Sequence, residues 1–302
     1  MEPDLFKAPP PAASTVGDGD SSVAFSPDGR RLAITLRTGA NIRIWLRSLD
    51  SHTAQVLEGT EGAMYPAWSP DGKPIAFFAD HKIKRIDVAT AMVQDVCAAD
   101  NGRGLAWGPD DTIVFSPDPF SGLFAVSASG GTPTQLTKPT APGETHRLPV
   151  FLPGGREVLF FDTSSKLESM HGLNVISLAS KKVTHVLDTN SGARYVAPGY
   201  LLYVQGGSLV ARRFDADALK TVANPVPVAD QVQFAPFRWT GAWDASAQGS
   251  LLYEEQPGGG KYQWTWVDPR GKELDKIGTP IALGLLDGDI SPDDRRVATS
   301  YG

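Results

Sequence analysis

Basic and aromatic side chains recur in this chain at one kind of position, shortly before each copy of a repeated turn. Four arginines stand four to nine residues before the turn that follows them: Arg103, Arg147, Arg194 and Arg238. Other ring side chains lie beside them or at the matching place of another copy: Tyr65, His146, Tyr195 and Trp239. Guanidinium groups bind anions, and aromatic rings offer stacking surfaces. These eight residues are therefore the candidate ligand site.

A plainer interpretation of the same residues stays open. They can be ordinary loop side chains that are solvated or that pair with nearby acids such as Glu61 and Glu144. Only the three-dimensional arrangement decides whether the cations converge on one place.

The sequence offers little that predicts catalysis. A serine hydrolase needs a Gly-x-Ser-x-Gly turn, and the sequence has none. The five histidines are scattered without a His-x-x-x-His pair, and Cys97 is the single cysteine. We therefore expect no catalytic residue, no metal site and no cofactor in this chain.

The turn that organises these positions is a short repeated phrase. Its clearest copies are Ala24-Phe25-Ser26-Pro27-Asp28-Gly29-Arg30 and Ala67-Trp68-Ser69-Pro70-Asp71-Gly72-Lys73. Pro and Gly supply the backbone angles of a tight turn, and apolar strand-type segments flank each copy. Seven copies follow one another at intervals between 39 and 49 residues, with these marker residues: Pro27, Pro70, Pro109, Pro153, Pro198, Ala247 and Pro292.

A strand-rich repeat of this length is typical of a β-propeller blade. The predicted fold class is all-β, a propeller of four-stranded antiparallel blades. In such a ring the innermost strand of each blade lines a central channel, so the candidate residues are expected at its mouth. Six blades are favoured by the number of complete repeats, with a seven-bladed ring closed by an incomplete last blade as the alternative.

The predicted organisation has three parts. Residues 1–20 are a Pro-rich linker or tail, and residues 21–288 hold six repeats that begin near 24, 67, 106, 150, 196 and 245. Residues 289–302 supply the first hairpin of a truncated seventh repeat, which suggests a fragment of a longer protein. The formal net charge is −6, and the sequence has no run of basic residues. Both observations argue against nucleic acid as a partner.

The Ser-Pro-Asp-Gly hairpin followed by a strand such as Ile75-Ala76-Phe77 resembles the WD40-like repeat of TolB-type propellers. Longer segments resemble the propeller region behind the catalytic domain of bacterial, especially acidobacterial, receptor-type serine/threonine kinases. Examples are Ile44-Trp45-Leu46-Arg47-Ser48-Leu49-Asp50 and Gly143-Glu144-Thr145-His146-Arg147-Leu148-Pro149. The kinase motifs are absent, since His146-Arg147-Leu148 lacks the Asp of the catalytic loop.

This resemblance implies a non-catalytic interaction or ligand-sensing module of a larger bacterial protein, the sensor region of such a kinase. It would place the propeller outside the cytoplasm. Expected partners are a protein, a peptide or a small anionic ligand, with no nucleic acid, no membrane insertion and a monomeric state. Two alternatives remain: the substrate-gating propeller of a prolyl-oligopeptidase-type peptidase, or a stand-alone protein-binding scaffold.

Overall fold

The computed structural model describes residues 13–14, 22–38, 41–51, 53–141, 143–163, 172–235 and 238–253, together with four later strands. These residues form antiparallel β-sheets joined by turns. The described residues include no helix that could cross a membrane.

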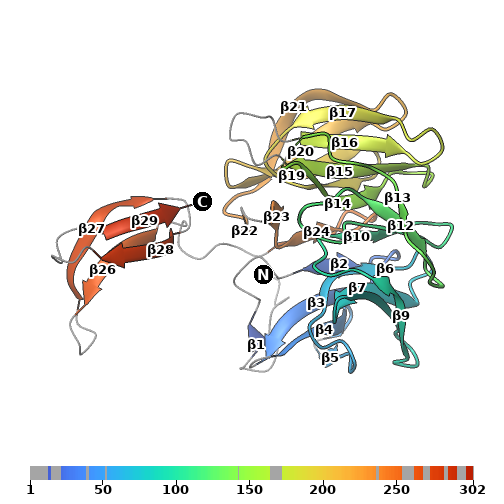
Figure 1. The fold of residues 1–302 in the computed structure, drawn as a ribbon, viewed down its shortest axis with the longest axis horizontal. Helices are drawn as coiled ribbons and strands as arrows, with labels where there is room; N and C mark the ends of the chain where they lie inside the picture. Colours follow the sequence, from blue (N-terminus) through green and yellow to red (C-terminus); the bar gives the residue numbers. More distant parts are fainter. Residues whose placement is uncertain are drawn as a thin grey trace.

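Five blades are complete, and their strands follow one another in sequence order, except that β1 and β2 of the first blade both pair with β3 (Figure 1). The first blade contains β1 (Ala13–Ser14), β2 (Val23–Phe25), β3 (Arg31–Thr38), β4 (Asn41–Ser48) and β5 (Ala54–Val56). The second contains β6 (Met64–Trp68), β7 (Pro74–Ala79), β8 (Lys82–Asp87) and β9 (Val93–Ala98). The third contains β10 (Leu105–Trp107), β11 (Thr112–Phe115), β12 (Phe124–Ser127) and β13 (Thr134–Gln135).

The fourth blade contains β14 (Thr145–Phe151), β15 (Glu157–Thr163), β16 (Gly172–Ser177) and β17 (Val183–Asp188). The fifth contains β18 (Ala193–Val196), β19 (Tyr200–Gln205), β20 (Ser208–Asp215) and β21 (Lys220–Ala229). A short ladder of β22 (Phe234–Ala235) and β23 (Thr240–Gly241) precedes the sixth position, which holds the pair β24 (Trp243–Ala245) and β25 (Leu251–Tyr253).

Two further hairpins follow: β26 (Tyr262–Val267) with β27 (Glu273–Ile281), and β28 (Leu285–Ile290) with β29 (Val297–Tyr301). The assignment of the last hairpin to a truncated seventh repeat stays a prediction. Most of the predicted linker, residues 1–20, lies outside the described residues, and only β1 is seen there, paired with β3.

The repeated turn owes its shape to hydrogen bonds within the Ser-Pro-Asp-Gly phrase. Ser26 Oγ donates to Asp28 Oδ1 at 2.5 Å, and the Arg30 backbone N–H donates to the same oxygen at 3.0 Å. These two bonds hold the pKa of Asp28 below its ordinary value. Gly29 has φ of +68°, which glycine adopts without strain. The same pattern forms at Ser69 and Asp71, so one phrase builds one hairpin.

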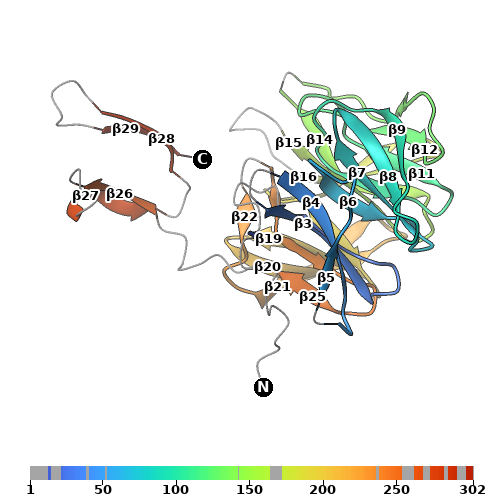
Figure 2. The same ribbon diagram turned by 90° about the horizontal axis from the view of Figure 1, so that it is seen from below.

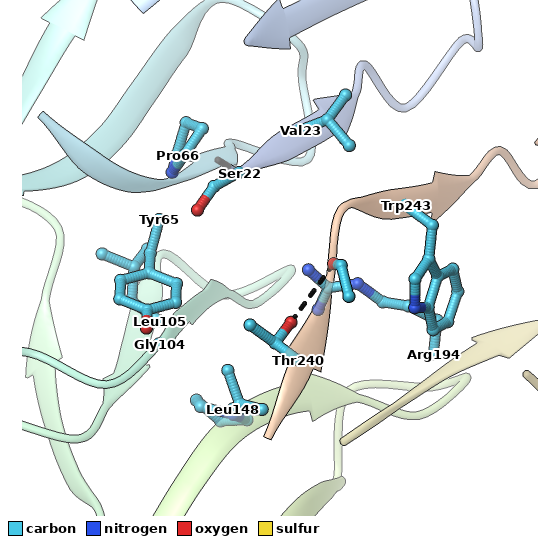
Figure 3. Close-up of a pocket in the computed structure, with 12 residues that line it drawn as sticks. Ser22, Val23, Tyr65, Pro66, Gly104, Leu105, Leu148, Arg194, Thr240 and Trp243 are labelled. Carbon is cyan, nitrogen blue, oxygen red and sulfur yellow. Dashed lines mark hydrogen bonds between the residues drawn. The ribbon is translucent and has the colours of Figure 1, made fainter. Parts of the chain in front are cut away.

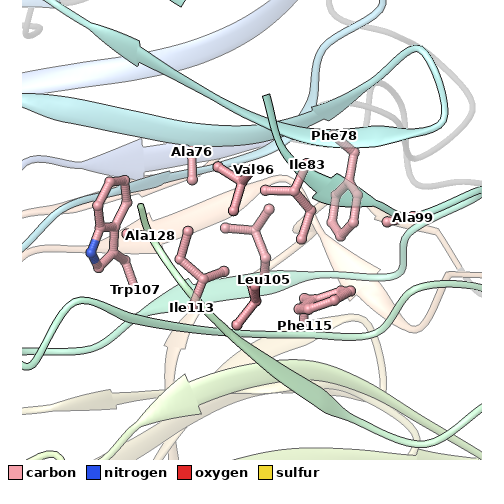
Figure 4. Packing of buried hydrophobic residues seen from close by; sticks show 11 residues of the cluster. Ala76, Phe78, Ile83, Val96, Ala99, Leu105, Trp107, Ile113, Phe115 and Ala128 are labelled. Atoms are coloured by element: carbon pink, nitrogen blue, oxygen red, sulfur yellow. The ribbon is translucent and has the colours of Figure 1, made fainter. Parts of the chain in front are cut away.

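Blades pack on one another through apolar side chains that are buried on both faces of the middle strands. Ala76, Phe78 and Ile83 of the second blade face Trp107 and Phe115 of the third (Figure 4). Trp68 adds a polar link, because its indole Nε1–H donates to the Ala24 carbonyl of the first blade at 3.0 Å. The recurring aromatic before each turn thus belongs to the contact between blades.

The inner strands form a closed cycle. Contacts join them in the order β2, β6, β10, β14, β18, β24 and back to β2. Figure 1 labels all of these strands except β18, and Figure 2 shows the same ribbon turned by 90°. The last step is a hydrogen bond from the Phe25 backbone N–H to Asp244 Oδ2 at 2.8 Å. Since β24 touches β2 directly, the ring has six positions, and the seven-bladed alternative does not describe it.

Asp244, in the sixth position, therefore contacts both the first and the fifth blade. Its Oδ1 lies 3.3 Å from Arg194 Nε of the fifth blade, while its Oδ2 accepts from the first. Burial raises the pKa of Asp244, and the Arg194 charge and the backbone N–H groups of Phe25 and Ala245 oppose that rise. The carboxylate needs these partners, because an unpaired buried charge is costly.

Replacing this carboxylate should weaken the ring. We expect Asp244→Ala to lower the free energy of unfolding by about 2–3 kcal/mol, because the Phe25 N–H loses its acceptor and Arg194 its counter-ion. Urea unfolding followed by circular dichroism measures the change. The matched control is Asp188→Ala, which removes an exposed carboxylate paired with His185 and should cost less than about 0.5 kcal/mol. Equal effects of the two substitutions would contradict the closing role of Asp244.

Candidate functional site at the channel mouth

A narrow space runs between the inner strands, and each of the six positions contributes to its wall. The lining includes Ser22, Tyr65, Leu148, Arg194 and Thr240, which surround one central space in Figure 3. It leaves about 40 Å³ for the centres of water-sized molecules. This lined space is called the channel mouth below.

Irregular backbone shapes this mouth. Pairing slips between β6 and β7 around Tyr65, and between β14 and β15 around Leu148. Both residues have positive φ, 51° and 52°, which is strained for a side chain with a Cβ. β-bulges of this kind re-aim side chains and are common beside functional sites. The Leu148 N–H donates to the Arg103 carbonyl at 2.9 Å, which fixes one bulge against the neighbouring blade.

Arg103 and Arg147 directly precede the lining residues Gly104 and Leu148, and Arg238 lies near enough for its charge to act on Arg147. The pKa of Arg147 is lowered to about 10, first by burial and then by the positive charges of Arg103 and Arg238, while Tyr65 acts in the opposite direction. Arg147 belongs to the fourth blade, Arg103 precedes the third, and Arg238 lies between β22 and β23 before the sixth position. The three positive charges thus act on one another, and ligand binding by them stays a prediction.

Arg147 is held firmly within this cluster. Its side chain is only 9% exposed. Its Nε donates to Thr145 Oγ1 at 2.7 Å, and its Nη2 donates to the Pro119 carbonyl at 3.1 Å. Arg103 is likewise oriented, since its Nη1 donates to the backbone and side chain of Asn101 at 3.1 and 2.6 Å.

Tyr65 completes the cluster from the second blade. Its ring packs edge-on against Phe78 with centroids 6.2 Å apart. Its hydroxyl is buried and has no hydrogen-bond partner among the residues that the structure describes. A phenol O–H beside arginines is a suitable donor to an anion.

The other four predicted residues are not part of this charge cluster, although Arg194 lines the same central space. Arg194 pairs with Asp244 and serves ring closure. Tyr195 packs against Phe214 with centroids 6.4 Å apart, in the apolar core between the fourth and fifth blades. Trp239 lies against Phe161 at 5.9 Å and contributes to the same core.

His146 points away from the arginines, because neighbouring residues of a strand face opposite sides of the sheet. It is 5% exposed, its ring lies 4.8 Å from that of Phe160, and its Nδ1 is 2.6 Å from Thr137 Oγ1. Its Nε2 lies 3.1 Å from Glu144 Oε1. The plainer interpretation is confirmed for His146, which pairs with Glu144, whereas Glu61 pairs at 3.1 Å with Arg43, which is not one of the eight candidates.

Sequence reasoning missed Asp162, which lies opposite His146 in the β14–β15 ladder. Burial raises the pKa of Asp162 to about 6, and the nearby Glu144 charge adds to the rise. Burial also lowers the pKa of His146, against an opposing hydrogen bond to Glu144. The signal that could have identified Asp162 is the hairpin itself, because it pairs the strands on either side of the turn and so places Asp162 opposite His146.

Comparison with known proteins supports the fold. No protein-family model matches the chain. An uncharacterized protein of Agrobacterium fabrum is 22% identical over 197 residues, which cover 57% of this chain and 65% of that protein. The chain thus spans just under two thirds of the length of the curated relative that it matches.

Solved propellers are similar in shape. TolB from Acinetobacter baumannii superposes with a TM-score of 0.56 at 17% identity, covering 69% of this chain and 55% of that one. The β-propeller domain of Cps50 (Swd1) from Myceliophteria thermophila gives 0.55 at 15% identity, with 90% of each chain covered. At these identities the likeness shows the fold alone: a TolB-like, WD40-like β-propeller.

The close approach of blades at the mouth can be tested at Gly104. It has φ of +106°, and a Cβ there would lie 2.8 Å from Leu148 Cα. We expect Gly104→Ala to lower the free energy of unfolding by about 2–3 kcal/mol. Gly62→Ala is the control, because Gly62 also has positive φ but open space around it, so about 1 kcal/mol is expected. Thermal or urea unfolding that fails to separate the two variants would contradict this packing.

The raised pKa of Asp162 predicts a pH-dependent stability difference between the native chain and Asp162→Asn. Between pH 4 and 6 the unfolded chain releases this proton first, so Asp162 favours the folded state less as the pH rises. The free energy of unfolding of the native chain should therefore fall relative to that of Asp162→Asn by about 1–2 kcal/mol across this window, after allowance for partial exposure. Urea unfolding in EDTA at several pH values measures it. A difference that stays constant would contradict the burial of this carboxyl.

Proposed function

We propose that this chain is a non-catalytic β-propeller module that binds an anionic ligand at the channel mouth, either a small molecule or an acidic part of a peptide. The convergence of Arg103, Arg147 and Arg238 beside Tyr65 carries the proposal. These side chains come from different blades, so ring closure is what assembles them.

The electrostatics of the mouth favour a negative charge. Three guanidinium groups repel one another, and burial removes part of the water that would screen Arg147. A carboxylate or phosphate placed among them would relieve that repulsion and accept charge-assisted hydrogen bonds. The buried Tyr65 hydroxyl supplies a further donor.

An exposed apolar side chain one residue from the contact of Arg147 favours a ligand with an apolar group next to its charge. Phe120 is 82% exposed, and it directly follows Pro119, whose carbonyl accepts from Arg147. The Phe120 N–H donates to Asp118 Oδ1 at 2.7 Å, which orders the turn that presents the ring. A peptide that ends in a carboxylate and carries an apolar side chain has this combination.

The module would act within a larger bacterial protein, as the sensor region of a receptor-type serine/threonine kinase. The segments of residues 44–50 and 143–149 support this assignment through their resemblance to kinase-associated propellers. In that setting the propeller would lie outside the cytoplasm and pass a binding event to the kinase.

The peptidase-gate alternative is less favoured by the channel. A gating propeller would have to admit its substrate along the axis, where side chains from all six positions line the space described above. A protein-binding scaffold remains compatible with the same ring, and it would engage its partner across a face rather than at the arginines.

The test compares ligand binding by the native chain and by Arg147→Gln/Arg238→Gln. Neutral glutamine is chosen because a reversed charge at the buried position 147 would threaten folding. In calorimetric titrations with carboxylate-terminated and phosphorylated peptides, the double variant should bind at least roughly tenfold more weakly. Affinity of the native chain should also fall as salt is added.

The matched control is Arg30→Gln/Arg213→Gln, which removes two exposed positive charges away from the mouth. It should bind as the native chain does. If the mouth variant, folded by circular dichroism, retained full affinity, the arginine cluster would not be the binding site.

A further inference from the structure

A compact group of metal-ligating side chains lies beneath the mouth, on the side of β14 opposite to the arginines. Ligand atoms of Glu144, His146 and Asp162 all lie within 4.8 Å of one another. His146 and Asp162 face each other across the β14–β15 ladder, and Glu144 comes from the loop that leads into β14. The three residues therefore meet through strand pairing and not through a sequence motif.

Each side chain presents one ligand atom to the middle of this group. The outer oxygen of Glu144, Oε2, accepts from Thr140 Oγ1 at 2.8 Å and from the Ala141 N–H at 2.7 Å. Its other oxygen, Oε1, faces His146 Nε2 at 3.1 Å. Asp162 Oδ1 is buried without a hydrogen-bond partner among the described residues.

The imidazole of His146 is oriented by a hydrogen bond at Nδ1, the ring nitrogen that faces away from the carboxylates, as in most metal-ligating histidines. Its Nδ1 lies 2.6 Å from Thr137 Oγ1, and that hydroxyl accepts from the Leu123 N–H at 2.8 Å. This arrangement leaves Nε2 to face the two carboxylates. A second contact of this kind fixes both the tautomer and the ring orientation of a ligating imidazole.

The distances suit one ion. Two ligands about 2.1 Å from a metal, at angles of 90° to 109°, lie roughly 3.0–3.4 Å apart. The 3.1 Å between His146 Nε2 and Glu144 Oε1 is in this range. Separations up to 4.8 Å are wider, so binding would draw the partly exposed Asp162 carboxylate inward.

We propose that Glu144, His146 and Asp162 form a binding site for one divalent transition-metal ion of the Zn²⁺ or Mn²⁺ type. One imidazole and two carboxylates match the ligand preference of such ions, whereas Ca²⁺ and Mg²⁺ favour oxygen ligands alone. A cation here neutralises two carboxylates that otherwise face each other in a half-buried space. It also ties the loop of Glu144 to the fourth blade, next to Arg147.

The test is a calorimetric titration of the EDTA-treated, tag-free chain with ZnCl₂ and separately with MnCl₂. The native chain should bind one ion, and Asp162→Asn and Glu144→Gln should each weaken binding by roughly tenfold or more. His185→Ala is the matched control: it removes an exposed histidine that pairs with Asp188 at 2.9 Å, and its binding should be unchanged. No binding by the native chain at about 1 mM metal, or equal loss in the control, would overturn the proposal.

A second readout covers the case in which the variants fail to fold. The electron spin-echo spectrum of Mn²⁺ bound to the His185→Ala chain should show modulation from one imidazole nitrogen. A spectrum without nitrogen modulation would overturn the assignment of His146 as a ligand.

Discussion

The carboxylate of Asp244 is the contact on which the ring depends. Every blade has two apolar faces, and each face is buried by a neighbour only if the first and last positions meet. Asp244 joins them by accepting from the Phe25 N–H while it pairs with Arg194 of the fifth blade. Closure in turn sets the distance between all inner strands, and thereby the width of the channel.

Closure also explains why the mouth is charged and strained. The inner strands converge there, and the bulges at Tyr65 and Leu148 turn the chain so that side chains fit around a narrow axis. Arg103, Arg147 and Arg238 reach this place from separate blades, each anchored on its own loop or strand. The rigid ring therefore keeps these three positive charges close to one another. In an unfolded chain their mutual repulsion would separate them.

Neighbouring side chains of β14 point to opposite sides of the sheet, so His146 and Arg147 belong to two different sites. Arg147 faces the mouth, while His146, one residue earlier, faces Thr137, Glu144 and Asp162. The proposed metal site and the proposed anion site are therefore back to back across β14. An ion held by His146 would stiffen the strand that carries Arg147, which links the two sites through rigid backbone.

The sequence was most informative for the features that the repeated phrase itself determines. The Ser-Pro-Asp-Gly phrase predicted the hairpins, their spacing predicted the propeller, and the fixed aromatic predicted the contacts between blades, as Trp68 illustrates. The position of the arginines relative to the turn singled out Arg103, Arg147 and Arg238, whose charges act on one another in the structure.

The positions of the remaining site residues depend on structural details that the spacing of the repeats does not determine. The pairing of Arg194 with Asp244 joins positions fifty residues apart without a shared motif. The opposite directions of His146 and Arg147 depend on where the strand begins and where its bulge falls. Asp162 reaches His146 only through the register of β14 with β15.

The most direct test of the account is the position of an anion in a crystal of this chain. Crystals soaked in sodium iodide locate bound anions by their anomalous scattering. We expect an iodide ion among Arg103, Arg147, Arg238 and Tyr65, within a six-position ring closed at Asp244. Iodide bound at other surfaces with none at the mouth would contradict it.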